Sequence, residues 1–270
     1  MINKIAVGIE YDGRAYAGWQ AQSGLTTIQG VAEAALSSVA DESINLVSAG
    51  RTDAGVHAVG QVAHFDTSAT RTTRAWVLGA NTHLPGDVCL TWARPVPQHF
   101  HARYSAEART YCYFVCNRAT RSALAAGRAA LVHRPLDHER MIEAARALVG
   151  EHDFSAFRAA ECQARSPVRR LTDIAVERHG DFLLLRVTAN AFLHHMVRNI
   201  AGLLIAIGQG KADPAWAREV LESRDRTRGA PTAPSDGLYL WQVRYPAAFG
   251  LPNEPAPASA IIRGMPYPAH

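Results

Sequence analysis

Short runs in which every second residue is apolar recur along this chain, and runs with helical spacing separate them. A period of two places apolar side chains on one face of a strand, whereas a period near 3.6 places them along one side of a helix. Strands are expected over residues 4–11, 44–49, 61–65, 88–93, 109–116, 171–178, 182–188 and 238–245. Helices are expected over residues 28–39, 73–81, 138–149 and 193–207 and after Asp213-Pro214. This mixture favours an α+β fold.

The order of strands and helices occurs twice, which predicts two similar α/β lobes with mostly antiparallel sheets packed by helices. The expected lobes are residues 1–106 and 107–247, and a Pro/Ala-rich tail over 248–270 is expected to be poorly ordered. A chain of 270 residues is long enough for two buried cores.

Neither a transmembrane run nor a secretory signal is expected from the sequence. The longest apolar runs are shorter than the roughly 18 residues that a membrane helix needs. The four cysteines show no zinc-binding spacing. These features favour a reduced, cytoplasmic protein without a membrane association.

Basic residues exceed acidic ones, 28 to 24, and lysine occurs only at Lys4 and Lys211. Arginines gather in three segments that are expected to be loops or loop edges, where a guanidinium can reach phosphates. They are Arg118, Arg121 and Arg128; Arg165, Arg169 and Arg170; and Arg224, Arg226 and Arg228. The pattern favours a nucleic-acid partner, although solvated surface charge would give the same composition.

A charged cluster interrupts two apolar runs at residues 48–58, SAGRTDAGVHA. Gly50 and Gly55 permit a sharp turn and the close approach of a ligand. Asp53 is expected to stay ionised beside Arg51, because a nearby positive charge favours the carboxylate. An ionised carboxylate can act as a nucleophile or stabilise a developing positive charge.

Two other interpretations of this cluster remain open at this stage. Asp53 can simply cap its own loop as an Asx-turn. Asp53, His57 and His64 can instead be metal ligands, but their spacing matches no standard zinc pattern and no fourth ligand is evident. Without a metal, His57 is expected to shape the loop or to contact a phosphate.

Tyr111 and Arg198 are further candidates. On the alternating strand ARTYCYF, Tyr111 shares a face with Arg109 and Tyr113, and it can either pack in the core or stack on an exposed base. Arg198 is expected one turn after His194 and His195 on an apolar helix. There it would seek a carboxylate, unless it extends to solvent at the helix edge.

Taken together, the segments resemble the tRNA pseudouridine synthase A family. The resemblance begins with SAGRTDAGVHAVGQVAHF and continues through FHARYSAEARTYCYFVCN, GEHDFSAFRAAECQARSPVRR, ANAFLHHMVRNIAG and GLYLWQVRYP. It covers roughly residues 4–247. Around Tyr111, Thr110 and Cys112 stand where family members often carry arginine, and this difference affects phosphate contacts more than chemistry.

The resemblance implies conversion of uridine to pseudouridine at positions 38, 39 and 40 of the tRNA anticodon stem-loop. It implies a homodimer, no cofactor and no metal, and two lobes that form a central basic cleft. By resemblance, Asp53 is the catalytic aspartate and Arg198 is the basic residue that pairs with it. Tyr111 contacts the target base, and Arg51 helps to hold the target nucleotide out of its helix.

Two other functions would account for part of this pattern. A non-catalytic tRNA-binding or chaperone protein on the same scaffold would keep the arginines but would not need Asp53. A metal-dependent hydrolase would use Asp53 with His57 and His64. Modified tRNA after incubation and metal analysis of the purified protein distinguish these alternatives.

Overall fold

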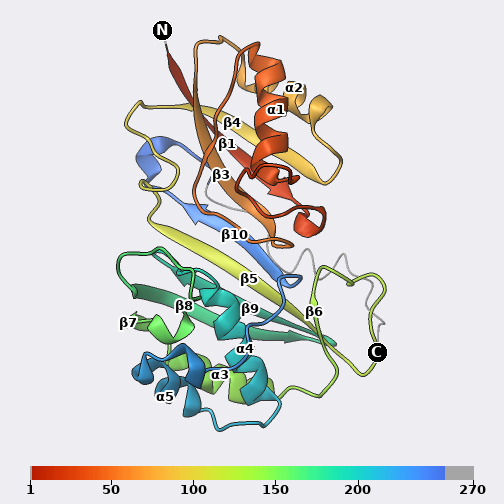
Figure 1. Cartoon of the computed structure of the whole chain (residues 1–270), viewed down its shortest axis with the longest axis vertical. Coiled ribbons are helices and arrows are strands. Elements are labelled where there is room, and N and C mark those ends of the chain that lie inside the picture. Colours follow the sequence, from red (N-terminus) through yellow and green to blue (C-terminus); the bar gives the residue numbers. More distant parts are fainter. Residues whose placement is uncertain (1, 253–270) are drawn as a thin grey trace. The chain divides into compact units, whose positions relative to one another are not determined.

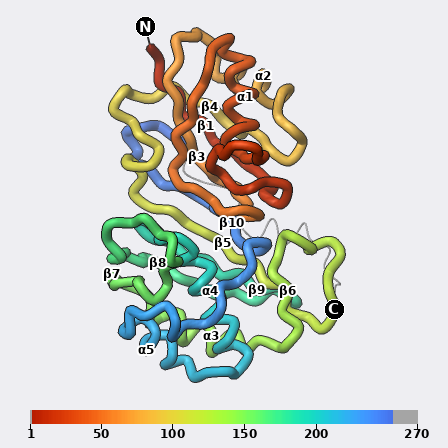
Figure 2. The backbone as a smooth tube through the Cα atoms, viewed as in Figure 1, coloured from red at the N-terminus to blue at the C-terminus, as the bar shows by residue number. Residues whose placement is uncertain are grey.

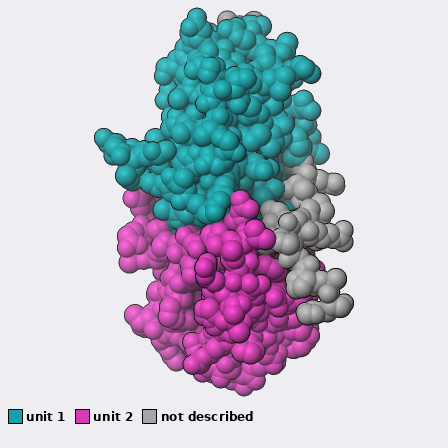
Figure 3. All heavy atoms as spheres, turned by 90° about the vertical axis from the view of Figure 1, so that its right-hand side faces the viewer, with its two compact units in different colours: residues 1–107, 239–255 teal, residues 108–238, 256–270 magenta. Residues whose placement is uncertain are grey.

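The computed structural model describes residues 2–252, and these residues form two compact units (Figure 1, Figure 3). Unit 1 contains the described residues through Glu107 and those from Tyr239 onward, and unit 2 contains Ala108–Leu238. The first boundary adjoins the expected one at residue 106. Residues 239–247 differ from the expected division, because they group with unit 1. Residues 253–270 of the expected tail lie outside the described residues.

The sheet of unit 1 has the strand order β4-β1-β3-β10, and β2 also pairs with β3. All of these pairs are antiparallel except β10 with β3, where Tyr239 lies opposite His57. This parallel pair places β10 in the sheet of unit 1. The strands are β1 (Asn3–Tyr11), β2 (Val47–Ser48), β3 (His57–Thr67), β4 (Val88–Val96) and β10 (Leu238–Arg244).

Two helices, α1 (Ile28–Ala40) and α2 (Thr73–His83), pack side by side against the sheet of unit 1 (Figure 1). Each begins at a threonine cap whose hydroxyl accepts a backbone N–H: Thr27 from Gly30, and Thr72 from Ala75. Such caps satisfy amide groups that a helix start leaves unpaired. Short 3-10 turns lie at η1 (Gly13–Ala15) and η4 (Ala247–Phe249).

The sheet of unit 2 runs β5-β9-β8-β7 with antiparallel pairs throughout, and β6 pairs in parallel with β5. The strands expected over residues 171–178 and 182–188 are confirmed as β8 and β9, which form a hairpin through Gly180 and Asp181. A wide loop separates β5 from β6 (Figure 2). The strands are β5 (Ala108–Asn117), β6 (Ala130–Val132), β7 (Gly150–Asp153), β8 (Val168–His179) and β9 (Phe182–Ala189).

Three helices lie together against the sheet of unit 2 (Figure 1). They are α3 (His138–Arg146), α4 (Met196–Gly208) and α5 (Trp216–Ser223), with short 3-10 turns at η2 (Ser155–Phe157) and η3 (Arg226–Arg228). Mostly antiparallel sheets with separate helices confirm the expected α+β class. No helix within residues 2–252 has both the length and the apolar character that a bilayer span requires.

Two helix predictions were wrong in part. Helix α4 begins at Met196 rather than Leu193, because His195 has a left-handed backbone with φ +61°. The two histidines therefore precede the helix that carries Arg198. Helix α3 ends at Arg146 rather than at residue 149, and its buried residues are Met141, Ala144 and Ala145. Val149 lies beyond the helix and is exposed.

Candidate active site

Residues 49–56, here called the aspartate loop, connect β2 to β3 in unit 1. Gly55 has φ +78°, a conformation that glycine adopts without strain. Two further glycines lie against the loop. A Cβ on Gly13 would lie 2.0 Å from the carbonyl oxygen of Val56, and a Cβ on Gly18 would lie 2.7 Å from that of Thr52. The loop therefore rests directly on neighbouring backbone.

Hydrogen bonds from several elements fix the first half of the aspartate loop. The side chain of Gln61 donates to the carbonyl of Gly50 at 2.7 Å, and the backbone N–H of Trp19 donates to the carbonyl of Thr52 at 2.9 Å. The hydroxyl of Thr52 lies 2.8 Å from that of Tyr11, in the interior. Thr52 is therefore held through both its backbone and its side chain.

The loop presents its two charged residues differently. Arg51 is exposed, whereas Asp53 is only half-exposed between buried Thr52 and the turn at Ala54 and Gly55. The carbonyl of Asp53 accepts the N–H of Val56 at 3.2 Å, which closes that turn through the backbone. The backbone that carries the carboxylate is thus fixed by hydrogen bonds, and a reacting group needs such a fixed position relative to its substrate.

His57 and His64 have structural roles in β3. The Nδ1 atom of His57 accepts the backbone N–H of Gly13 at 3.3 Å, and its ring stacks on Tyr239 at 4.5 Å. The Nδ1 atom of His64 accepts the backbone N–H of Ala102 at 3.1 Å. Both side chains are buried. The described residues contain no set of converging ligand atoms that combines Asp53 with His57 and His64.

Tyr111 lies on β5 in unit 2 and is half-exposed, whereas Tyr113 on the same face is fully buried. The ring of Tyr111 meets Phe192 edge to face at a centroid distance of 5.0 Å. Arg109, one step back on this face, donates to the carbonyl of Asn190 at 3.0 Å. Tyr111 therefore has a supported ring with one part open, which suits a base-contacting role.

Arg198 lies in the first turn of α4 and is half-buried. Its Nε donates to the carbonyl of Ala233 at 2.8 Å, and its own carbonyl accepts the N–H of Ala233 at 3.1 Å. These two bonds hold both the backbone of Arg198 and the Nε end of its guanidinium against Ala233. Burial raises the pKa of neighbouring Tyr113, which keeps that hydroxyl neutral where it donates to the carbonyl of Pro234.

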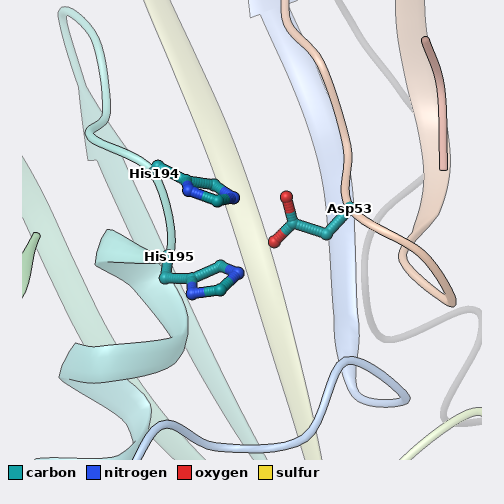
Figure 4. Close-up of side chains that lie close together, drawn as sticks. All are labelled: Asp53, His194 and His195. Carbon is teal, nitrogen blue, oxygen red and sulfur yellow. The ribbon is translucent and has the colours of Figure 1, made fainter. Parts of the chain in front are cut away.

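His194 and His195 lie directly before α4 rather than within it. Figure 4 shows both side chains on the residues that precede α4, and Asp53 on the loop before β3. The two rings lie 4.0 Å apart, and His195 has the left-handed backbone described above. A non-glycine residue with positive φ is uncommon and often marks a functional or constrained position. The adjacent pair before an apolar run was the available signal.

The arginine clusters divide into structural and exposed members. Arg118 donates to the carbonyls of Thr120 and Arg121, and Arg226 donates to the side chains of Asn199 and Thr232. These guanidiniums fix their own loops. The exposed members, which can reach phosphates, include Arg121, Arg165, Arg170 and Arg228.

Comparison with known proteins agrees with the resemblance. A family model described as tRNA pseudouridine synthase matches residues 8–105 and 144–246. The tRNA pseudouridine synthase A of Methylococcus capsulatus is 57% identical over 251 residues, which are 93% of each chain. That of Legionella pneumophila strain Corby is 54% identical over 94% of this chain and 97% of its own. That of Alcanivorax borkumensis is 53% identical over 94% of this chain and 96% of its own.

The family model alone covers more than half of the chain, in two blocks that include the aspartate loop and Arg198. The chain therefore belongs to the tRNA pseudouridine synthase A family, a family of isomerases.

Proposed function

We propose that this chain isomerises uridine to pseudouridine at positions 38, 39 and 40 of the tRNA anticodon stem-loop. Family membership supports the reaction, and the stem-loop positions rest on the resemblance. The observation that carries the proposal is the aspartate loop. A half-exposed Asp53 follows a residue that is held at its carbonyl and its hydroxyl, within the segment at which the resemblance begins.

In this reaction the N1–C1′ bond breaks, the uracil turns, C5 bonds to C1′, a proton leaves C5, and N1 takes up a proton. No atom is gained or lost, so the reaction needs no oxidant, reductant or second substrate. The sugar gains positive charge as the N1–C1′ bond lengthens, and a carboxylate stabilises such a cation in glycosidases. We assign this role to Asp53, whether it bonds to C1′, adds to C6 or assists a glycal.

The target nucleotide lies within a stacked stem, so it must be flipped out at a cost of a few kcal/mol. We assign Arg51 to the flipped state, because its exposed guanidinium can bond a phosphate. Tyr111 would then stack on the extruded uracil. Arg198 would keep the carboxylate of Asp53 ionised and oriented, since a guanidinium favours the charged form of a nearby carboxyl.

We also propose that the chain acts as a homodimer on tRNA, in the cytoplasm, without cofactor or metal. These statements and the central basic cleft rest on the resemblance. The absence of a metal role for His57 and His64 has separate support, because the Nδ1 atom of each ring accepts a backbone N–H.

Mass mapping of pseudouridine in tRNA tests the proposal. An unmodified anticodon stem-loop tRNA is incubated with the wild-type chain and with Asp53→Asn. Modification confined to positions 38, 39 and 40, and lost in the variant, is expected. Asp66→Asn is a matched control, because Asp66 lies on β3 and pairs with Lys4 rather than belonging to the loop. Pseudouridine at other positions, or an unmodified tRNA with wild type, would contradict the proposal.

A further inference from the structure

The turn that follows β4 in unit 1 displays an aromatic ring that the reaction does not use. Tyr104 is 76% exposed, although it lies between buried Ala102 and buried Ala108 along the chain. At this exposure most of the ring is accessible to a bound molecule. The question is what this ring contacts.

The backbone of this turn is fixed by hydrogen bonds. The Nδ1 atom of His101 accepts the N–H groups of Arg103 and Tyr104 at 3.1 and 3.3 Å. The N–H of Ser105 donates to the carbonyl of His101 at 2.8 Å, and the hydroxyl of Ser105 accepts the N–H of His101 at 3.0 Å. Burial lowers the pKa of His101, which agrees with a neutral ring that accepts these bonds.

The middle of the turn is anchored in the core of unit 1. The hydroxyl of Tyr245 donates to the carbonyl of Ala102 at 2.6 Å, and the N–H of Ala102 donates to His64. Phe100 is fully buried against Tyr245, with ring centroids 5.2 Å apart. Because hydrogen bonds hold Ala102 before it and the N–H of Tyr104 itself, the backbone that carries the exposed ring is fixed.

Two side chains of the same turn contact the Tyr104 ring. The ring of His101 is tilted against it by 35° at a centroid distance of 4.3 Å, and the guanidinium of Arg103 lies over it, 5.7 Å from its centroid. The segment His99–Ala106 contains no acidic residue. The result is a largely exposed aromatic ring supported by an imidazole and a guanidinium.

From this geometry we infer that Tyr104 is a stacking site for an unpaired nucleobase of the bound RNA. Every base has a face that stacks on an aromatic ring, and the adjacent guanidinium complements the phosphate backbone. A protein partner would need a broad apolar area, whereas this turn offers one ring and one cation. The site rests on the proposed function for its RNA substrate, but it takes no part in the chemistry.

Binding of unmodified tRNA by Tyr104→Ala and Tyr104→Phe tests the inference. We expect Kd to rise roughly tenfold in Tyr104→Ala and to stay near wild type in Tyr104→Phe, which keeps the ring. The slope of log Kd against log salt should be unchanged, because no ionic contact is lost. Leu78→Ala is the matched control, since Leu78 is an exposed apolar residue, 50% accessible, on α2 rather than on this turn.

Three further readouts separate the possible failures. The unfolding midpoint of Tyr104→Ala should match wild type, because the side chain is exposed. The single-turnover rate at saturating protein should also match wild type. Wild-type Kd in Tyr104→Ala, or a change in its sedimentation that indicates a protein interface, would overturn the inference. An unmodified tRNA that still binds in a Tyr104-dependent way would contradict the proposed reaction and leave the stacking site intact.

Discussion

The hydroxyl of Tyr11, at the end of β1, lies 2.8 Å from the hydroxyl of Thr52, the residue before Asp53. Both side chains are buried, so this contact is shielded from water. The carbonyl of Thr52 also accepts the N–H of Trp19, so the residue before Asp53 is tied both to β1, an inner strand of unit 1, and to the segment that follows it. The Tyr11–Thr52 contact therefore helps to fix the backbone that carries the proposed catalytic carboxylate.

Removing the Tyr11 hydroxyl should loosen the backbone next to Asp53 without creating a cavity in the core, because the ring is kept. We expect Tyr11→Phe to lower the free energy of unfolding by about 1 kcal/mol, the net value of a typical hydrogen bond. The single-turnover rate should fall several-fold, because the carboxylate is less well placed. Urea unfolding and single-turnover pseudouridine formation measure these effects.

A double-mutant cycle with Thr52→Val isolates the Tyr11–Thr52 contact. The double variant should lose less stability and less rate than the two single changes added together, because both remove the same bond. Additive losses would show that the two hydroxyls act independently.

Close packing of Gly13 against the aspartate loop gives a second prediction. A methyl group at Gly13 would lie 2.0 Å from the carbonyl oxygen of Val56, so the backbone must move. We expect Gly13→Ala to lower the free energy of unfolding by about 2 kcal/mol or more and to abolish most of the activity. Gly86→Ala is the control, because its Cβ would meet nothing within 4 Å. Equal stability of the two variants would contradict the proposed contact.

Local patterns predicted most of the elements in both units. The helices expected from residues 28 and 138 begin at those residues, and the side chains of Thr27 and Asp137 accept backbone N–H groups at the starts of α1 and α3. The strands expected over residues 171–178 and 182–188 lie within β8 and β9, which join at Gly180 and Asp181. These features depend on a few neighbouring residues, so the chemistry of the turn or cap is visible in the sequence.

Long-range features could not be predicted in this way. The parallel pairing of Tyr239 with His57 joins residues that are distant in the chain, and periodicity carries no information about such a partner. The start of α4 was also not predictable, because an apolar run indicates a buried helix face but not the residue at which the helix begins. His195 has a left-handed backbone, so α4 begins at Met196 rather than at Leu193. In the aspartate loop, the residues that hold Thr52 come from other elements.

The burial of His64 gives a prediction about pH. Burial, and then the charge of Lys4, lower the pKa of His64 from 6.5 to about 4 in the folded chain. The unfolded chain therefore binds more protons between these values, and this contribution to stability is complete above pH 6.5 and is lost as the pH falls toward 4. Urea midpoints at pH 7 and pH 5 should differ less in His64→Asn than in wild type. An equal difference in both proteins would contradict this assignment.

Tyr111 and Tyr113 should respond differently to loss of the hydroxyl. Tyr111→Phe should reduce the single-turnover rate more than tRNA affinity, because the ring that meets Phe192 is retained. Tyr113→Phe should instead lower the free energy of unfolding by about 1 kcal/mol, because its buried hydroxyl donates to Pro234. A wild-type rate in Tyr111→Phe would count against any chemical role for that hydroxyl.

The role of Asp53 is the central claim, and tritium release from tRNA labelled at C5 of uridine tests it most directly. Each turnover frees the C5 hydrogen, so the assay follows bond formation rather than binding. The account predicts that Asp53→Asn releases no tritium above background while its Kd for tRNA stays within a few-fold of wild type. Substantial tritium release by Asp53→Asn would contradict the assignment of Asp53 as the reacting carboxylate.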